Sequence, residues 1–76
     1  MENKYGFIRY EYLHDDDFNI IDVFNEEHSI SNGDILYCID GVMYYVDQYD
    51  DKLVKLIFDM KKFFDDDTYL MFDQLP

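Results

Sequence analysis

The sequence has no alanine and no tryptophan, and it contains one cysteine, one arginine, one proline and three glycines. The single Cys38 cannot form a disulfide within the chain, which favours a reducing, intracellular compartment. Phe, Tyr, Met, Ile, Asn and Lys, whose codons are AT-rich, make up 35 of the 76 residues. This bias indicates an AT-rich genome, as many bacteria and their phages have.

Basic residues are scarce as well. Six Lys and Arg stand against 18 Asp and Glu, which gives a formal net charge of -12 at pH 7. Because phosphates are bound by Lys and Arg, direct binding to nucleic acid or to an anionic membrane is disfavoured. No apolar run approaches the ~20 residues of a spanning helix, and residues 1–6 lack a signal-peptide pattern. We expect a cytoplasmic protein, located in the host cytoplasm if a phage encodes it.

Aromatic residues, in contrast, are plentiful. They make up 20% of the chain, and hydrophobic residues together make up 49%, which is more than a disordered acidic segment carries. The length, with no linker and no internal repeat, predicts one domain over residues 1–76. A domain of this size buries about 60% of its unfolded surface, which leaves little room for a catalytic cavity. We therefore expect a surface function without enzyme activity.

Apolar patterning predicts an α+β fold, with a small antiparallel sheet of three to four strands and one amphipathic helix on one face. Residues 5–13 alternate as a strand does, and residues 68–73 are expected to form the last strand. Residues 18–25 fit a helix or a strand, and a short helix or irregular crossover is favoured. Residues 51–64 favour a helix over a strand because their apolar residues recur at helical spacing. Those residues are Leu53, Leu56, Ile57, Met60 and Phe64.

A β-hairpin is predicted over residues 34–49. Two β-rich runs flank Asp40-Gly41, the pair that a type I′ turn requires. The two-residue loop predicts two faces, and the more apolar one is expected to face the core. Its cross-strand pairs are Ile39 with Val42, Tyr37 with Tyr44 and Ile35 with Val46. Cys38 is expected to be a small buried hydrophobe, and the repulsive pair of Asp34 and Asp47 predicts a solvated end.

The hairpin also offers an alternative fold. The segments Gly33–Tyr37, Asp40-Gly41 and Tyr44–Val46 resemble strand pairs of SH3-like barrels. That resemblance implies a small all-β barrel.

Motifs for catalysis and cofactor binding are missing, and we expect neither a catalytic residue nor a cofactor. One metal-binding pattern is present: Asp15, Asp17, Asn19 and Glu26 occupy positions 1, 3, 5 and 12 of an EF-hand-like loop. Position 6 is Ile20, although the sharp turn there needs glycine. A solvated acidic turn is favoured, and a metal-binding module stays an alternative.

The excess of negative charge is the remaining functional feature, because a net charge of about 2–8 suffices for solubility in a small domain. In size, acidity, aromatic content and codon bias the chain resembles small phage-encoded DNA mimics. That class includes anti-CRISPR proteins, uracil-DNA glycosylase inhibitors and anti-restriction proteins. The resemblance implies a non-enzymatic inhibitor that occludes the positively charged nucleic-acid-binding site of a partner, such as a nuclease or CRISPR effector.

Two alternatives share this acidity: an immunity protein or antitoxin that neutralises a basic toxin, and a small acidic scaffold. Whether the chain is a monomer or a homodimer stays open. The candidate partner-binding residues are acids at turns and element ends, together with tyrosines that could serve as anchors if exposed. They are Asp15, Asp16, Asp17, Glu26, Glu27, Asp47, Asp50, Asp51, Asp65, Asp66, Asp67, Tyr10, Tyr12, Tyr45 and Tyr49.

Overall fold

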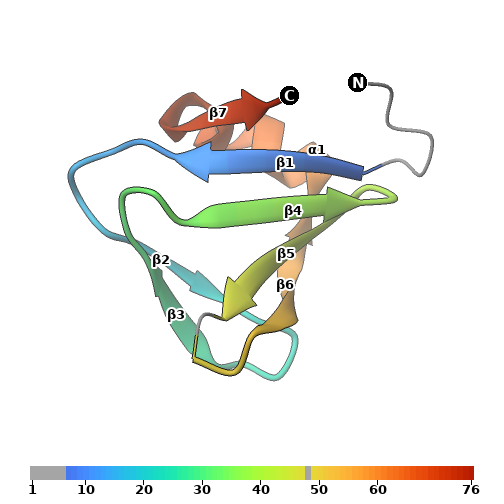
Figure 1. Cartoon of the computed structure of the whole chain (residues 1–76). Coiled ribbons are helices and arrows are strands. Elements are labelled where there is room, and N and C mark those ends of the chain that lie inside the picture. The colour runs from blue at the N-terminus through green and yellow to red at the C-terminus, as the bar shows by residue number, and fades with distance from the viewer. Residues whose placement is uncertain (1–6, 48) are drawn as a thin grey trace.

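Seven strands dominate the computed structural model, which describes residues 7–47 and 49–76 (Figure 1). Five form an antiparallel sheet in the order β6-β5-β4-β1-β7, and β2 and β3 form a separate two-stranded ribbon. The strands are β1 (Phe7–Tyr12), β2 (Phe18–Ile21), β3 (Glu27–Ile30), β4 (Ile35–Ile39), β5 (Val42–Asp47), β6 (Lys52–Asp59) and β7 (Phe72–Leu75). A helix α1 (Met60–Asp65) and a 3-10 turn η1 (Thr68–Met71) lie between β6 and β7.

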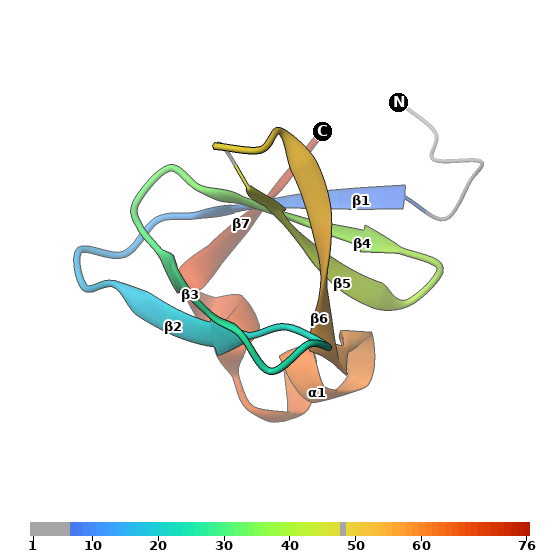
Figure 2. The ribbon, with the colours of Figure 1, turned by 90° about the horizontal axis from the view of Figure 1, so that it is seen from below.

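The α+β prediction is therefore wrong, and the fold is closer to the all-β alternative. The β2–β3 ribbon and α1 lie on the same side of the large sheet (Figure 2). They contribute Ile20, Ile30 and Phe63 to one core with the inward side chains of the sheet. An isolated bridge between Asp22 and Leu56 joins the ribbon to β6.

The largest error concerns residues 51–64, where β6 occupies most of the expected helix. The competing strand pattern was the correct one: Val54 and Leu56 are buried, and Phe58 packs against the core. Leu53 and Ile57, two members of the expected helical face, are 49% and 62% exposed. Pairing of β6 with β5 outweighs the weak local preference for helix.

Two other segments also differ from expectation. Residues 18–21 form strand β2 and not a short helix, because Phe18 and Ile20 alternate toward the core while β3 supplies the pairing partner. The last predicted strand begins later, since Thr68–Met71 form the 3-10 turn before β7. Strand β1 is confirmed over its described part, and residues 5 and 6 of that prediction lie outside the described residues.

The hairpin of β4 and β5 is confirmed in turn and register. Asp40 and Gly41 have φ of 54° and 84°, as a type I′ turn requires. Ile39 pairs with Val42, and Tyr37 pairs with Tyr44.

The predicted core face of this hairpin is wrong, because the opposite face points inward. Leu36, Cys38 and Met43 are at most 2% exposed, while the expected core residues Ile35, Tyr37, Ile39, Val42, Tyr44 and Val46 are only partly buried. Both faces are apolar, so the hairpin alone could not decide between them. The side covered by the β2–β3 ribbon and α1 became the core.

Candidate functional site

A row of carboxylates follows the end of the large sheet where β1 and β5 end and β4 and β6 begin. We call it the acidic rim, and it consists of Asp15, Asp16, Asp17, Asp34, Asp47, Asp50 and Asp51. In Figure 1 the β1–β2 loop and the β3–β4 turn lie side by side at the left, and the β5–β6 turn lies below them.

The β1–β2 loop holds the first part of the rim in a defined conformation. The Tyr12 hydroxyl donates to the Asp16 carbonyl, and the Asp16 N–H donates to His14 Nδ1 at 3.3 Å. Ser31 Oγ donates to Asp17 Oδ1 at 3.1 Å. Asp15, Asp16 and Asp17 are nevertheless exposed, so the loop presents its charges to solvent from a fixed backbone.

Ser31 connects this loop to the next part of the rim. Its hydroxyl donates to Asp17, and its backbone N–H donates to Asp34 Oδ2 at 2.8 Å. The Tyr12 N–H donates to the Asp34 carbonyl at 2.8 Å, which fixes the β3–β4 turn against the end of β1. One serine therefore holds two carboxylates of the rim.

Tyr45 lies near two carboxylates of the rim, Asp34 and Asp47. Burial raises the pKa of the Tyr45 phenol, and the charges of Asp34 and Asp47 raise this pKa further. The hairpin of β4 and β5 was predicted to end in solvent here, because Asp34 and Asp47 lie opposite each other across its strands and repel. Asp34 itself was not among the predicted partner-binding residues, although the hairpin register was the signal that could have included it.

The β5–β6 turn forms the last part of the rim. Asp47 Oδ1 accepts the backbone N–H of Tyr49 at 2.9 Å and that of Asp50 at 3.3 Å. The Tyr49 side chain is 100% exposed beside these acids. Lys52 Nζ lies 3.9 Å from Asp50 Oδ2 with both side chains over 60% exposed, and such a pair neutralises little charge.

The other predicted partner-binding acids lie elsewhere. Asp65–Asp67 follow α1, and Figure 2 shows α1 apart from the β1–β2 loop and the β5–β6 turn. Lys61 pairs with Asp65 at 2.7 Å and Lys62 with Asp66 at 3.6 Å. Glu26 and Glu27 lie at the β2–β3 turn. The sequence could not separate these groups because only the fold decides which acidic turns meet.

Two of the four tyrosines predicted as anchors are buried and cannot contact a partner. Tyr10 and Tyr12 are 5% and 1% exposed and belong to the core. Tyr45 is partly buried and packs against the core, which leaves Tyr49 as the exposed member of the four.

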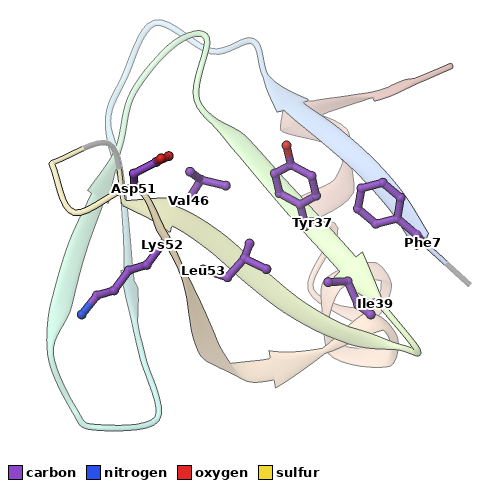
Figure 3. A pocket seen from close by; sticks show the side chains of 7 residues that line it. All are labelled: Phe7, Tyr37, Ile39, Val46, Asp51, Lys52 and Leu53. Carbon is purple, nitrogen blue, oxygen red and sulfur yellow. The ribbon is translucent and has the colours of Figure 1, made fainter. Parts of the chain in front are cut away.

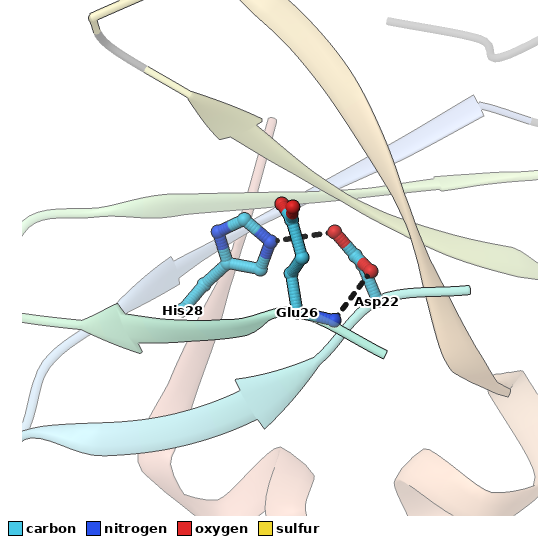
Figure 4. A group of neighbouring side chains, drawn as sticks. All are labelled: Asp22, Glu26 and His28. Atoms are coloured by element: carbon cyan, nitrogen blue, oxygen red, sulfur yellow. Dashed lines mark hydrogen bonds and ion pairs between the residues drawn. The ribbon is translucent and has the colours of Figure 1, made fainter. Parts of the chain in front are cut away.

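The predicted metal ligands are not gathered at one point. Asp15 and Asp17 precede β2, Asn19 lies within it, and Glu26 comes at the turn beyond it. Within the described residues a different group brings possible ligand atoms within 4.8 Å of one another, namely Asp22, Glu26 and His28 (Figure 4). Cys38 is buried as predicted, and burial raises the pKa of its thiol.

The Asp22 carboxylate organises the β2–β3 turn by its own hydrogen bonds. Oδ1 accepts the N–H groups of Phe24 at 2.7 Å and Glu26 at 3.0 Å, and His28 Nε2 lies 2.8 Å from Oδ2. Asp22 is 2% exposed, and these bonds explain how a carboxylate is accommodated there. The Asp22–Leu56 bridge makes this turn the attachment of the ribbon to β6.

The stability contributed by Asp22 is expected to disappear in acid. The hydrogen bonds from His28 and from the Glu26 N–H lower the pKa of the Asp22 carboxyl from its ordinary value of 3.8, against the effect of burial. Because the folded pKa is lowered, the contribution is fully present above the unfolded pKa of about 3.9 and is lost as pH falls through the folded pKa.

This pH dependence is measured by urea unfolding of the wild type and of Asp22→Asn between pH 6 and pH 2.5. The difference in unfolding free energy between them should be largest near pH 6 and shrink below pH 4. The wild type has to be compared with the variant at each pH, because protonation of the other carboxylates relieves repulsion within both chains and changes both unfolding free energies. Glu27→Gln, at an exposed position in β3 opposite Ile21, is the control and should follow the wild type throughout. A gap that stays constant down to pH 2.5 would contradict the assignment.

No helix in the described part of the chain is long and apolar enough to cross a membrane. No protein-family model matches the chain, and no match was found among curated proteins or among solved structures.

Proposed function

We propose that this chain is a non-enzymatic inhibitor that docks its acidic rim on a positively charged nucleic-acid-binding site of a partner protein and occludes it. The observation that carries the proposal is the rim itself. Seven aspartates from three connections between strands are brought to one end of the sheet. Lys52 pairs with Asp50, and that pair is long and exposed.

The arrangement suits a site built for phosphates. Carboxylates two residues apart on one strand lie ~6.6 Å from each other, whereas each strand of a duplex offers a phosphate every ~3.4 Å along the axis. One strand alone cannot match that density, but the three connections of the rim, which contribute three, one and three acids, approach it together. The resulting field also speeds the approach of a basic partner at low salt.

Fixed loops and an exposed aromatic ring add to the fit. The hydrogen bonds of Tyr12, Ser31 and Asp47 order the rim before binding, so less conformational entropy is lost on association. Tyr49 projects from the same end of the sheet, and tyrosine is frequent among the residues that dominate interface energetics.

The proposal is tested by competition. Immobilised protein is used to capture partners from a bacterial lysate at low salt, and the captured protein is then bound to a fluorescent DNA duplex. Addition of this chain should release the duplex. The inhibition constant, calculated from the midpoint and from the partner's affinity for DNA at the same salt concentration, should rise with salt. Simultaneous and independent binding of the partner to both molecules would exclude occlusion.

A matched pair of variants separates the rim from general acidity. Two triple variants each change the net charge from -12 to -9. The first is Asp15→Asn, Asp16→Asn, Asp17→Asn, and the second is Asp65→Asn, Asp66→Asn, Asp67→Asn. The first should weaken inhibition by about tenfold or more, since charges at a binding surface control the encounter rate and its salt dependence. The second should change it little. Equal losses in both would show that overall charge acts and not the rim.

A further inference from the structure

The outward face of the large sheet is the second surface that the fold leaves open. Its side chains form three rows across β1, β4, β5 and β6, as the strand register shows. We call this surface the outer face. The rows are Phe7, Ile39, Val42 and Asp59; Arg9, Tyr37, Tyr44 and Lys55; and Glu11, Ile35, Val46 and Leu53.

Most of the outer face is apolar and accessible. Phe7 and Tyr37 stack with ring centroids 5.3 Å apart, and Leu53 is 49% exposed. The surface is hollowed by a shallow groove of about 360 Å³ (Figure 3). The groove is lined by Phe7, Tyr37, Ile39, Val46, Asp51, Lys52 and Leu53. A contiguous apolar surface of this kind on a small domain marks an interaction site.

The charge of the outer face differs from that of the whole chain. Its charged side chains are two bases, Arg9 and Lys55, and two acids, Glu11 and Asp59. The row of Glu11 continues on β7 with the exposed Asp73, so two bases stand against three acids and the face carries -1. The whole chain carries -12. The face is therefore a nearly neutral area on a strongly negative molecule. Of the acidic rim, Asp51 reaches its groove, together with the oppositely charged Lys52, and the acids after α1 lie outside these rows.

We propose that the outer face binds a second copy of this chain and forms a symmetric homodimer. Two molecules of charge -12 repel each other wherever their acids meet, and the outer face is a place where they can approach with little net charge on the contact. Tyr37 and Tyr44 lie at the centre of the face and Phe7 at one corner, and interfaces favour both residue types. A basic partner would gain nothing from this face and would be attracted to the acidic rim instead.

The size of the face sets the expected strength. Three rows of four give twelve side chains, fewer than the about 20–30 residues that each side of a standard interface contributes. We therefore expect a dimer in equilibrium with the monomer at micromolar concentrations. Because salt screens the repulsion between the two acidic molecules, dimerisation should strengthen as salt rises. Binding of a basic partner to the rim should weaken under the same change.

Sedimentation equilibrium of the full chain at 5–200 µM, in 50 mM and 500 mM NaCl, tests the proposal. The dimer fraction should rise with concentration and should be larger in 500 mM NaCl. Leu53→Asn should raise the dimer dissociation constant by at least about tenfold, because each substitution occurs twice in a symmetric interface. Leu70→Asn is the control. Leu70 is 69% exposed in η1 and outside the face, so its substitution should leave the constant unchanged.

Three results would overturn the proposal. The first is a monomer at 200 µM in 500 mM NaCl. The second is a dimer that Leu53→Asn leaves intact. The third is a monomeric wild type whose binding to the captured partner is lost in Leu53→Asn, which would assign the face to that partner. Failure of the competition experiment on the acidic rim would leave the first two measurements interpretable, since neither of them needs a partner.

Discussion

Phe63→Ala is expected to lower the free energy of unfolding by about 3–5 kcal/mol, the range found for buried phenylalanines. Phe63 is 0% exposed although it belongs to a helix of six residues. Its ring centroid lies 4.9 Å from that of Tyr10 and 5.6 Å from that of Phe72. Truncation would leave a cavity between the sheet and α1, which rigid strands cannot close.

The loss is large for a chain of this length, since native domains are stable by only about 0.05–0.15 kcal/mol per residue. Urea unfolding followed by circular dichroism measures it. Phe64→Ala is the matched control, because Phe64 is the next residue of the same helix and is 44% exposed; its loss should stay below about 1 kcal/mol. If Phe63→Ala does not fold, Phe63→Leu gives the same ranking with a smaller loss. Equal losses at 63 and 64 would contradict this account of the core.

The buried position of Phe63 also shows where the sequence was sufficient and where it was not. In the helix expected over residues 51–64, Phe64 belonged to the apolar face and Phe63 did not. The same stretch fits a strand with Val54 and Leu56 inward, and only the pairing with β5 decides between the two. Because the chain is so rich in hydrophobic residues, the spacing in this stretch fits both a helix and a strand. Only knowledge of its long-range pairing partner, β5, decides between them.

The hairpin of β4 and β5 is the opposite case. Asp40-Gly41 determines turn type and register because few other residues accept positive φ at both positions. Register does not determine which face is inward, and Tyr37 and Tyr44 tolerate the outside because their hydroxyls can meet water. The proposed dimer surface exists because the hairpin is apolar on both sides.

For the candidate site, the sequence located acidic turns but not their association. Asp15–Asp17 and Asp47–Asp51 are 30 residues or more apart in the chain, and they share one end of the sheet because β1 and β5 run in the same direction on either side of β4. The separation of Asp65–Asp67 from this end follows from β6 and α1, since only the last part of the helix expected over residues 51–64 is helical.

Tyr12 links the core to the acidic rim, and its substitution is expected to have the second-largest effect. Its side chain is 1% exposed, with the ring centroid 5.1 Å from that of Phe72, while its hydroxyl donates to the Asp16 carbonyl. Tyr12→Ala should cost about 3–5 kcal/mol of unfolding free energy by removing a buried ring. Tyr12→Phe keeps the ring and removes only the hydrogen bond, so it should cost about 0.5–1.5 kcal/mol.

The functional consequence of Tyr12→Phe is the more informative one. Without the hydroxyl, the β1–β2 loop keeps the bonds of His14 and Ser31 but loses its attachment to the core. Amide hydrogen exchange of residues 15–17 should become faster, while exchange in β4 stays unchanged. Tyr10→Phe is the control, because the Tyr10 hydroxyl makes only a 4.0 Å contact with the Met60 sulfur. Unchanged exchange in Tyr12→Phe would mean that the loop is ordered by Ser31 and His14 alone. Faster exchange together with weaker inhibition would show that the order of the rim, as well as its charge, contributes to binding.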